Sequence, residues 1–556
     1  MRYPATIRTS VSQQAITKVT RLFNGTIADV LNELLQNARR AGATAVAIEL
    51  LDPDGQPTLA VRDDGRGIAD PAVLVSLGRS GWDDSILRRE DPAGMGVFSL
   101  AGRRVEIRSC PFGNTAGWRI VIPAGAWETS AEIPVEPFPV TSGTEILIDM
   151  PTARSAQLES AAVAAARFFP LPVTLNGQML ARHDFLKDAV HVERWHGCRI
   201  GVHRDEDRLG YDSPRINFHG VTIATKLPVI SEVDHGPSWS VMVDIADAPD
   251  LQLVLPARKE MVANDALEAL RFACRRIIYQ VIADQPEHRL SYANWREAGL
   301  LGIDLPEATP CLRAWKPRTG EPFGRERGQR THTQDVILVT DYDADAEQCA
   351  APVLSNIELL GARPVFEQDA FEGYRWYDAL PRIRSLHFEI ETGGATHQYL
   401  PDPVPDDLPS GRVAAITLHL EIAASGRDHD KPTARVFPLD VLVCNNDTYN
   451  LDETPILIAE GADVSPGRLA WLLEASLFSP DDDAESDSAE TQRERFGQEA
   501  RNIANQLLLG EEAALLEMLR EQLRDNVAWL VPKEKLLTAT IARFKVELTL
   551  ADAPAA

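Results

Sequence analysis

Residues 26–150 constrain the fold most, because their apolar residues change repeatedly from the period of a helix to that of a strand. Apolar side chains at helical spacing predict an amphipathic helix that ends at Gly42; they are Ile27, Val30, Leu31, Leu34, Leu35, Ala38 and Ala41. Strand-like runs then occupy residues 43–51, 58–62, 104–109, 117–122 and 144–149. The turn sequence at 52–55 predicts that the first two runs form a hairpin. This order predicts an α+β domain whose sheet is mainly antiparallel.

The chain of 556 residues is too long for one hydrophobic core, so we expect several domains. The predicted order is an α/β sandwich at 1–152, a second α/β domain at 153–285, a mixed α/β region of unknown role at 286–478, an acidic linker at 479–497 and a helical C-terminal segment at 498–556. The leucines that follow Leu508 fit either an ordinary helical core or a contact between two copies of the chain.

The formal net charge of −26 predicts that most of the surface repels nucleic acid. Residues 1–150 contain 15 Lys and Arg against 18 Asp and Glu, so most of the negative charge lies later in the chain. Binding to DNA would therefore need a local basic groove. No apolar run approaches the length of a membrane span, and residues 1–30 lack the apolar stretch of a signal peptide, so we expect a cytoplasmic protein without a membrane partner. The six cysteines include no CxxC pair, which indicates free thiols rather than a zinc site.

Glu33 and Asn37 are four residues apart on the predicted helix, so their side chains project from one face. Neither residue belongs to the apolar stripe. A carboxylate in this position can accept a proton from water, and the neighbouring amide oxygen can coordinate a hard cation. Taken alone, the pair fits an ordinary solvated helix face better, because Glu and Asn are common surface residues.

The segment Asp63-Asp64-Gly65-Arg66-Gly67-Ile68 follows directly after a predicted strand. Its glycines let the backbone approach a flat ligand closely, and Asp63 can accept a hydrogen bond from an exocyclic amine such as that of adenine. A tight acidic turn explains the same residues. A further glycine pair occurs in Ala93-Gly94-Met95-Gly96-Val97-Phe98-Ser99, where a loop is predicted to lead into a helix. Small residues there expose backbone N–H groups that favour phosphate binding, although such a pair often just ends a loop.

In this order the three segments resemble the motifs of the GHKL superfamily, which comprises DNA gyrase, the ninety-kilodalton heat-shock chaperone, histidine kinases and MutL. Residues 33–43 resemble the family's N box and are most similar to that of MutL. Residues 63–67 resemble the first glycine box, and residues 94–99 resemble the chaperone form of the second. Ser142-Gly143-Thr144-Glu145 is similar to the Gly-Thr that closes the adenine pocket. The resemblance covers residues 20–285 and implies a Bergerat-type ATP-binding sandwich followed by a transducer-like domain.

The resemblance implies ATP as the ligand, Mg²⁺ as the cofactor and a role for each matching residue. Glu33 would be the catalytic base that polarises the attacking water, and Asn37 would ligate Mg²⁺. Asp63 would recognise the adenine amino group, partly through a water shared with Thr144. Residues 77–92 would form a lid over the nucleotide. The implied nucleotide-binding residues are Asn37, Asp63, Gly65, Gly67, Ile68, Ser80, Gly94, Met95, Gly96, Val97, Phe98 and Thr144.

Two positions outside these motifs complete the comparison with the family. Arg40 stands where many relatives carry an Asp three residues after the Mg²⁺-binding Asn, so one polar contact of the pocket must differ. Residues 255–261 resemble a stretch of the MutL transducer domain. In relatives a basic residue of that loop reaches the γ-phosphate, which implies a catalytic role for Arg258, with Lys259 as the alternative.

These features predict an ATPase that drives a clamp-like conformational cycle, with two copies of the chain dimerising on ATP binding. The acidic charge favours a protein client, or a nucleoprotein complex, over free DNA. The alternative is an ATP-dependent DNA-processing factor that resembles MutL or a topoisomerase subunit and has a basic groove. A non-hydrolysing ATP sensor is disfavoured because Glu33 and Asn37 are both present. A histidine kinase is disfavoured because no phosphoacceptor helix precedes the ATP-binding segment.

The segment 336–345 is the one acidic motif beyond the resemblance. A predicted strand at 336–339 runs into three aspartates at alternate positions, Asp341, Asp343 and Asp345. This arrangement can bind Mg²⁺, but an acidic loop at the end of a strand is the favoured interpretation.

Overall fold

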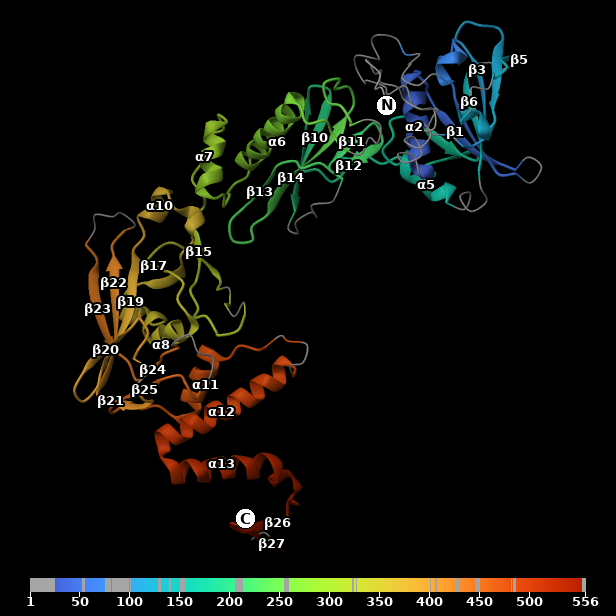
Figure 1. Ribbon diagram of the computed structural model, residues 1–556. Coiled ribbons are helices and arrows are strands. Elements are labelled where there is room, and N and C mark those ends of the chain that lie inside the picture. The colour runs from blue at the N-terminus through green and yellow to red at the C-terminus, as the bar shows by residue number, and fades with distance from the viewer. Residues whose placement is uncertain are drawn as a thin grey trace, which may run out of the picture. The chain divides into compact units, whose positions relative to one another are not determined.

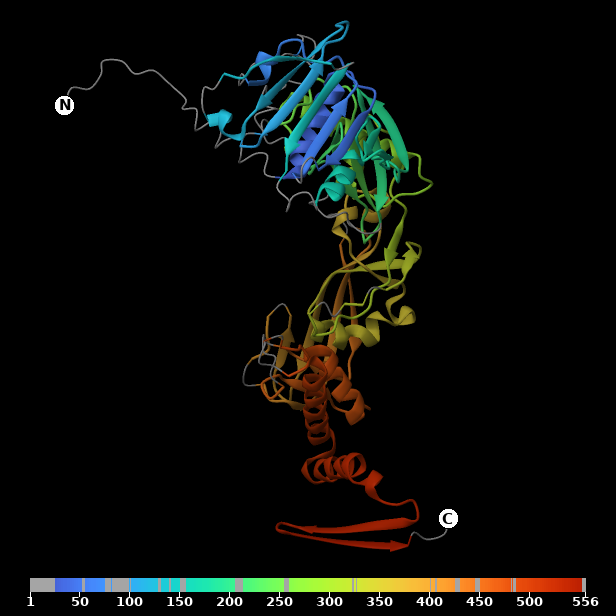
Figure 2. The ribbon, with the colours of Figure 1, turned by 90° about the vertical axis from the view of Figure 1, so that its right-hand side faces the viewer.

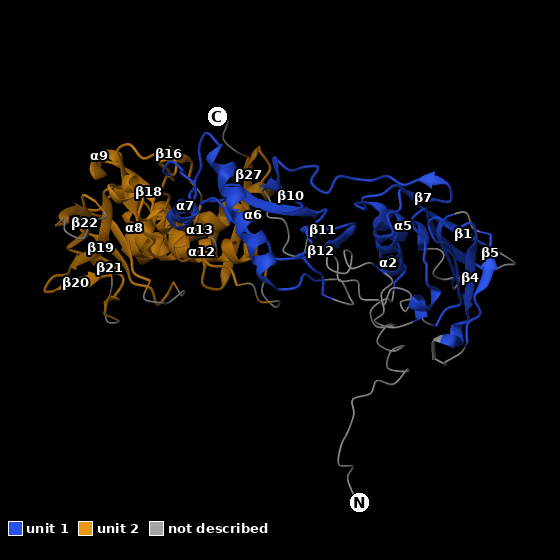
Figure 3. Cartoon of the chain, turned by 90° about the horizontal axis from the view of Figure 1, so that it is seen from above, with its two compact units in different colours: residues 1–307 blue, residues 308–556 orange. Residues whose placement is uncertain are grey.

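Residues 1–307 and 308–556 form two compact units, coloured separately in Figure 3, and each has its own sheets and hydrophobic core. The structure is a computed structural model. It describes residues 26–52, 56–75, 82, 100, 102–128, 132–139, 142–150, 157–205, 214–254, 260–322, 325–326, 328–400, 402–405, 408–425, 431–445, 451–481, 483 and 487–552. Helices and strands are mixed in both units, so the predicted α+β class is confirmed.

The first unit begins with an eight-stranded sheet in the order β5-β4-β3-β6-β2-β1-β7-β8. Neighbouring strands are antiparallel, except that β1 and β7 are parallel. The strands are β1 (Val46–Leu51), β2 (Thr58–Asp63), β3 (Val105–Cys110), β4 (Gly117–Ile122), β5 (Glu136–Phe138), β6 (Gly143–Asp149), β7 (Val173–Leu175) and β8 (Gln178–Met179). The predicted antiparallel sheet and the pairing of β1 with β2 are confirmed.

Helices α2 (Ile27–Arg40) and α5 (Leu158–Ala166) cover one face of this sheet, as Figures 1 and 2 show. α2 begins with a capping box in which Thr26 and Asp29 exchange hydrogen bonds. The predicted apolar stripe of α2, except for Ala41, is buried in the core beneath it, so this predicted helix is confirmed. Two short 3-10 helices, η2 (Pro71–Val75) and η4 (Ala124–Glu128), lie between strands.

The first sheet extends to Met179, beyond the boundary that the sequence predicts at residue 152. α5, β7 and β8 all follow that boundary, but their apolar residues complete the core that α2 covers. Strand β7 pairs with β1, so chain segments more than a hundred residues apart are neighbours in one sheet. Sequence periodicity does not reveal such a non-local pairing.

A second sheet of the first unit has the order β12-β11-β14-β10-β9, and β13 pairs with β14. Its strands are β9 (His191–Trp195), β10 (Cys198–Asp205), β11 (Ile216–Phe218), β12 (Val221–Ile223), β13 (Val229–Ser231) and β14 (Ser238–Ile245). Helix α6 (Asp265–Ala283) packs its apolar face on this sheet, and α7 (Tyr292–Leu300) follows. Leu253 lies outside these strands and forms a single isolated bridge with Met261.

The second unit contains a sheet in the order β18-β17-β19-β22-β23, with β20 paired to β19, and a smaller sheet in the order β21-β25-β24. Its strands are β15 (Cys311–Arg313), β16 (Arg330–His332), β17 (Val336–Val339), β18 (Arg363–Phe366), β19 (Arg382–Glu391), β20 (Thr396–Tyr399), β21 (Gly411–Val413), β22 (Ala415–Ala423), β23 (Thr433–Pro438), β24 (Val441–Val443), β25 (Ile456–Ala459), β26 (Lys535–Ala542) and β27 (Lys545–Asp552). Its helices are α8 (Ala344–Leu354), α9 (Ile357–Leu360), η5 (Asp369–Phe371), α10 (Arg375–Asp378), α11 (Pro466–Leu477), α12 (Ala489–Leu509), α13 (Glu511–Asn526) and η6 (Ala528–Leu530).

Two features of the second unit differ from expectation. Helix α12 begins at Ala489, inside the predicted acidic linker, after Ser488 caps its first turn. The predicted helical end continues only through α13 and η6, since residues 535–552 form the hairpin of β26 and β27.

The acidic segment that follows β17 is bound to neighbouring protein groups. Asp345 is buried, and its Oδ2 accepts a hydrogen bond of 2.6 Å from the Tyr399 hydroxyl. Glu347 is also buried and accepts from the Tyr342 N–H at 2.9 Å and from the Arg325 guanidinium at 2.6 Å. These contacts assign the segment a structural role. Among the described residues, no helix has the length and apolar content that a membrane span requires.

Candidate functional site

Asp63, Thr144 and Ser109 lie side by side at one end of the first sheet. Asp63 ends β2 and is paired with Thr144 at the start of β6, while Thr144 is also paired with Ser109 near the end of β3. The residues two and four positions away on these strands belong to the core beneath α2, so the three side chains share the face that α2 covers. The hydroxyl oxygens of Ser109 and Thr144 are 3.1 Å apart. Three strands thus bring three polar side chains to one place at the edge of an apolar core.

The carboxylate of Asp63 is only partly accessible to solvent, and this changes its chemistry. Burial raises its pKa to about 6, although hydrogen bonds from the backbone of Gly65 and Thr144 oppose the shift. The Gly65 N–H donates to Asp63 Oδ1 at 2.9 Å. A carboxylate that is poorly hydrated in this way favours a ligand that donates a hydrogen bond to it.

Two glycines of the loop after β2 are required by the close approach of other backbone groups. A Cβ on Gly65 would lie 2.7 Å from Ala41 Cβ and 2.9 Å from Asp63 Oδ1. Gly67 has a φ of +67°, and a Cβ there would lie 2.2 Å from the carbonyl oxygen of Cys110. The glycines therefore let the loop pass between the end of α2 and the end of β3.

Ser109 links this loop to Thr144, and the sequence motifs do not identify it. Its Oγ accepts from the Ile68 N–H at 2.9 Å and donates to the Gly143 carbonyl at 3.0 Å. The indole N–H of Trp118 donates to the carbonyl of Ile68 at 2.9 Å, so both backbone polar groups of this residue are fixed. Strand alternation gives one signal for Ser109, since it is a polar residue at the position where Val105 and Ile107 face the core.

The neighbouring carboxylate, Asp64, holds the loop against the end of α2. It accepts hydrogen bonds from the N–H of Thr44 at 2.7 Å, from that of Ala45 at 3.2 Å and from the Thr44 hydroxyl. Burial opposes the charge of Asp64, but these hydrogen bonds outweigh it and lower the pKa of the carboxyl. The Arg66 N–H also donates to the Ala41 carbonyl at 2.9 Å. Asp63 is thus available to a ligand, whereas Asp64 is committed to the fold.

Glu33, Asn37 and Arg40 form a chain of hydrogen bonds along one side of α2. The Arg40 Nη1 donates to Asn37 Oδ1 at 3.2 Å, and the Asn37 Nδ2 donates to Glu33 Oε1 at 3.3 Å. A guanidinium can only donate and a carboxylate can only accept, so these contacts fix which end of the amide is oxygen. The amide oxygen of Asn37 therefore faces a cation. The Ala41 N–H donates to the Asn37 carbonyl, and the Ala41 carbonyl accepts from the Arg66 N–H. Asn37 therefore lies one helical turn before the residue that contacts the glycine loop.

Several residues implied by the resemblance lie outside the described residues. They are Ser80, Gly94, Met95, Gly96, Val97, Phe98 and Arg258, together with Lys259. Within the implied lid at 77–92, the described residue is Trp82, and the Arg66 guanidinium lies 5.1 Å from its ring centre. The structure therefore brings together Asp63, Thr144, the first glycine loop and the turn of α2 that carries Asn37.

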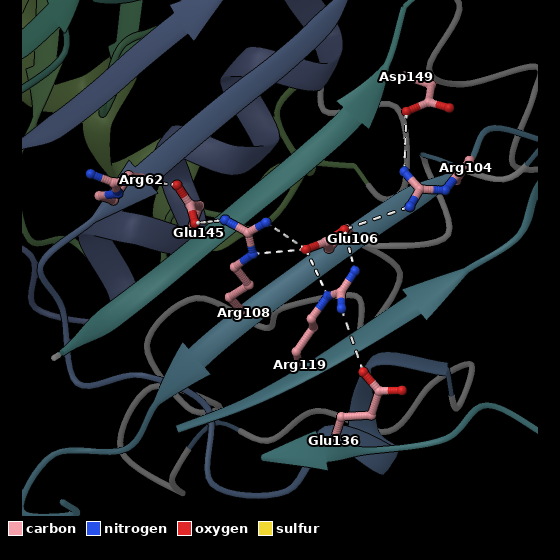
Figure 4. Close-up of polar contacts among 8 residues, drawn as sticks. All are labelled: Arg62, Arg104, Glu106, Arg108, Arg119, Glu136, Glu145 and Asp149. Carbon is pink, nitrogen blue, oxygen red and sulfur yellow. Dashed lines mark hydrogen bonds and ion pairs between the residues drawn. The ribbon is translucent and has the colours of Figure 1, made fainter. Parts of the chain in front are cut away.

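The opposite face of the sheet carries a network of ion pairs, shown in Figure 4. Glu106 accepts from the Nε of Arg119 at 2.8 Å and from that of Arg108 at 2.7 Å. Arg108 also bonds Glu145 at 2.9 Å. Burial of Glu106 opposes its charge, but the two guanidinium groups outweigh it and lower the pKa of this carboxyl. The remaining members, Arg62, Arg104, Glu136 and Asp149, extend the network at its edges.

No family model matches the chain, and no curated protein matches its sequence. Solved structures with a similar arrangement include the ATPase region of Saccharomyces cerevisiae topoisomerase II, with 9% identity over 46% of this chain and 89% of that chain and a TM-score of 0.34. The N-terminal domain of a DNA repair protein is similar at 12% identity over 38% of this chain and 80% of that chain, with a TM-score of 0.25. These values do not assign the chain to either family.

Proposed function

We propose that this chain is a Mg²⁺-dependent ATPase of the GHKL type and that it binds the adenine ring at the ends of β2, β3 and β6. The alignment of Asp63, Thr144 and Ser109 beside the end of α2 carries the proposal. A poorly hydrated carboxylate next to a glycine loop suits a flat heterocycle with an exocyclic amine. In this proposal Asp63 accepts from the amine, and Thr144 contributes through a shared water.

Glu33 and Asn37 suit the phosphate end of the nucleotide. Both present oxygen atoms on adjacent turns of α2, and oxygen ligands are what Mg²⁺ prefers. A bound Mg²⁺ would supply charge neutralisation for the phosphate oxygens. In the proposal Glu33 accepts the proton of the attacking water, and the Asn37 N–H orients that carboxylate. The proposal also includes contacts of residues 94–98 and Ser80 with the nucleotide and a contact of Arg258 with the γ-phosphate.

We further propose that hydrolysis drives a clamp-like cycle on a protein client, with two copies of the chain closing on ATP binding. The net charge of −26 supports a protein over DNA. The ion-pair network of Figure 4 supports the same choice, because its four arginines already contact carboxylates and do not form a basic groove for phosphates. The alternative is a DNA-processing ATPase.

Calorimetric titration with a non-hydrolysable ATP analogue and Mg²⁺ tests the binding site. Wild-type protein should bind, and Asp63→Asn should lose at least about 100-fold in affinity. The Asn side chain would present to the adenine amine either its N–H donor, which cannot accept, or its neutral oxygen, which accepts more weakly than a carboxylate. Glu49→Gln is the matched control, since Glu49 lies on the opposite face of the same sheet. Absence of binding by the wild type, or unchanged binding by Asp63→Asn, removes the proposed pocket.

Steady-state hydrolysis separates catalysis from binding. Glu33→Ala should retain nucleotide binding and lose hydrolysis by about 100-fold or more, because the general base is gone.

ATPase assays with and without duplex DNA distinguish a protein-directed clamp from a DNA-processing ATPase. A protein-directed clamp should hydrolyse ATP at the same rate in both, whereas stimulation by DNA would favour the DNA-processing alternative.

A further inference from the structure

A groove of about 600 Å³ lies in the first unit, between helix α6 and the connection that joins β12 to β13. Figure 1 shows α6 beside the second sheet, to which both strands belong. The helix lines the groove with residues between Glu268 and Arg275, and the connection lines it with Lys226, Leu227 and Pro228. We call it the α6 groove, and its described lining residues are all distinct from those of the proposed nucleotide site.

Arg271 holds the two sides of the α6 groove together. Its Nε donates to the Lys226 carbonyl at 3.1 Å, and its Nη1 donates to Glu268 Oε1 at 2.5 Å. The face of α6 that meets the sheet is anchored by Leu270 and Cys274, which are both fully buried. The groove is therefore formed before a ligand arrives, and this lowers the entropy that binding costs.

The α6 groove has an apolar part centred on Phe272. This side chain is 56% exposed, although Leu270 and Cys274 of the same helix are fully buried. Phe272 therefore lies outside the face of α6 that packs on the sheet, and it lines the groove instead. On the facing wall Leu227 is buried and Pro228 is half-buried. An exposed aromatic ring in a preformed groove is typical of the point at which a partner's apolar side chain binds.

The α6 groove is basic, although the chain as a whole is acidic. Among the described residues that line it, Lys226, Arg271 and Arg275 are basic and Glu268 is acidic. The whole chain has a net charge of −26. Arg275 also bonds Glu297 at 3.2 Å, but a guanidinium is a multiple donor and can bond a ligand as well. Because screening in physiological salt limits charge interactions to about 8 Å, the charges of the groove itself decide which ligand it attracts.

We propose that the α6 groove binds a short acidic segment of another protein. An apolar side chain of that segment packs on Phe272, and neighbouring carboxylates pair with Lys226, Arg271 and Arg275. Charge complementarity selects this occupant. A nucleic acid is charged at every nucleotide and would extend past the groove onto the rest of an acidic chain, so it requires a longer basic track. This surface does not depend on the proposed binding of ATP.

Fluorescence anisotropy of the full chain without nucleotide tests the proposal, with a dye-labelled peptide of alternating aspartate and leucine as the probe. Wild-type protein should bind this peptide at micromolar concentrations, and binding should weaken as salt is added. Lys226→Glu should weaken binding by about tenfold or more, because a carboxylate then faces the carboxylates of the peptide. Phe272→Ala should weaken it by about tenfold, because it removes the apolar contact. Both side chains are exposed, so both variants should fold as the wild type does.

Arg194→Glu is the matched control for Lys226→Glu. Arg194 is also exposed, and its replacement changes the charge by the same amount, but it lies on β9 at the other end of the second sheet. This variant should bind the peptide as the wild type does. Glu268→Gln should act in the opposite direction and tighten binding by about twofold, because it removes the acidic residue from the wall of the groove.

The proposal is overturned if the wild type does not bind the peptide, or if it binds a peptide with lysine in place of aspartate equally well. Equal weakening by Arg194→Glu and Lys226→Glu also overturns it, because the contact would then not be in the groove. Tighter binding of oligothymidylate that is lost in Lys226→Glu would assign the groove to nucleic acid instead. Since no nucleotide is present, failure here is distinct from failure of the proposed ATP site.

Discussion

At the scale of single residues, the site depends on how one carboxylate is hydrated. Asp63 and Asp64 are adjacent in sequence, but their pKa values move in opposite directions. Asp64 is stabilised as an anion by hydrogen bonds from the turn after α2. Burial removes water from Asp63, and its hydrogen bonds do not fully compensate for this loss, so Asp63 is the carboxylate that we propose to contact a ligand.

The raised pKa of Asp63 would give the proposed binding site a pH dependence. The carboxylate accepts a hydrogen bond from an amine more strongly than the protonated carboxyl does, and below pH 6 the free protein holds a proton on Asp63 that a ligand must displace. We therefore expect the affinity for adenosine to be constant above pH 7 and to fall by up to about tenfold per pH unit below 6. Adenosine has no phosphate that titrates in this range. A calorimetric series from pH 5 to 8 checks this, and a constant affinity across the series would contradict it.

Arg40 makes a second prediction at this scale. Its guanidinium donates to the oxygen of Asn37 that is proposed to ligate Mg²⁺, so the two cations compete for one atom. Arg40→Ala should lower the Mg²⁺ concentration needed for half-maximal ATP binding by about three- to tenfold, the net value of an ordinary hydrogen bond. Mg²⁺ titrations at fixed ATP measure this, with Arg39→Ala as the control. A higher Mg²⁺ requirement would instead indicate that Arg40 assists nucleotide binding.

Sequence motifs predicted the candidate site residues that have recognisable neighbours, namely Asp63 with its glycines and Thr144, and the structure places these residues side by side. Ser109 was not predicted, because a single serine in an apolar strand acquires meaning only through its register with β6. The contact of Arg40 with Asn37 was likewise not predicted, since spacing along a helix does not specify which groups bond. Contacts between side chains depend on the packing of elements that are distant in sequence.

At the scale of elements, the loop after β2 is fixed by backbone contacts more than by side chains. Gly67 combines a positive φ with a position at which a Cβ would clash with the backbone of Cys110. A side chain at this position would displace the loop that holds Asp63 next to Thr144.

Gly67→Ala tests how strictly this loop must fit. The added methyl would clash with the Cys110 carbonyl, so we expect a loss of about 1–3 kcal/mol in the free energy of unfolding and loss of nucleotide binding. Gly113→Ala is the matched control, because Gly113 also has a positive φ, of +82°, but its Cβ would meet no atom within 4 Å. Chemical denaturation and calorimetry measure the two effects. Equal behaviour of the two variants would show that the clash is relieved without consequence.

Longer elements with a clear period were predicted, as α2 and β4 show. Elements of two or three residues, such as β5, β8 and β13, contain too few residues to display a period. The C-terminal hairpin does alternate, but the leucine spacing of the preceding helix favoured a continuous helical prediction. Its turn, Arg543 and Phe544, contains no glycine or asparagine to mark a hairpin.

At the scale of the whole molecule, helix α2 connects the proposed site with the second sheet of the first unit. Gln36, the residue before Asn37, is buried and donates from its Nε2 to the His219 carbonyl at 2.6 Å. His219 lies in the turn between β11 and β12, two paired strands of the second sheet. If nucleotide binding shifts α2, the hydrogen bond from Gln36 would transmit the shift to His219 and so to the second sheet.

Gln36→Leu should separate nucleotide binding from its effect on the second sheet. Leucine keeps most of the volume but removes the donor, so ATP affinity should change less than about threefold. Nucleotide-induced hydrogen-exchange protection at residues 216–223 should be lost in this variant and present in the wild type. Asn32→Leu on the same helix is the control. Retained protection in Gln36→Leu would mean that the two sheets communicate by another route.

The parallel pairing of β1 with β7 has a practical consequence for anyone who isolates the proposed nucleotide-binding part. A fragment cut at residue 152 would keep Asp63 and Thr144 but would leave the β1 edge unpaired and the core under α2 without Leu158, Ala162 and Phe169. Open strand edges beside exposed apolar surface promote aggregation. An inactive, insoluble fragment of that length would therefore report a misplaced cut and would say nothing about catalysis, whereas one that ends after β8 keeps all eight strands of the sheet.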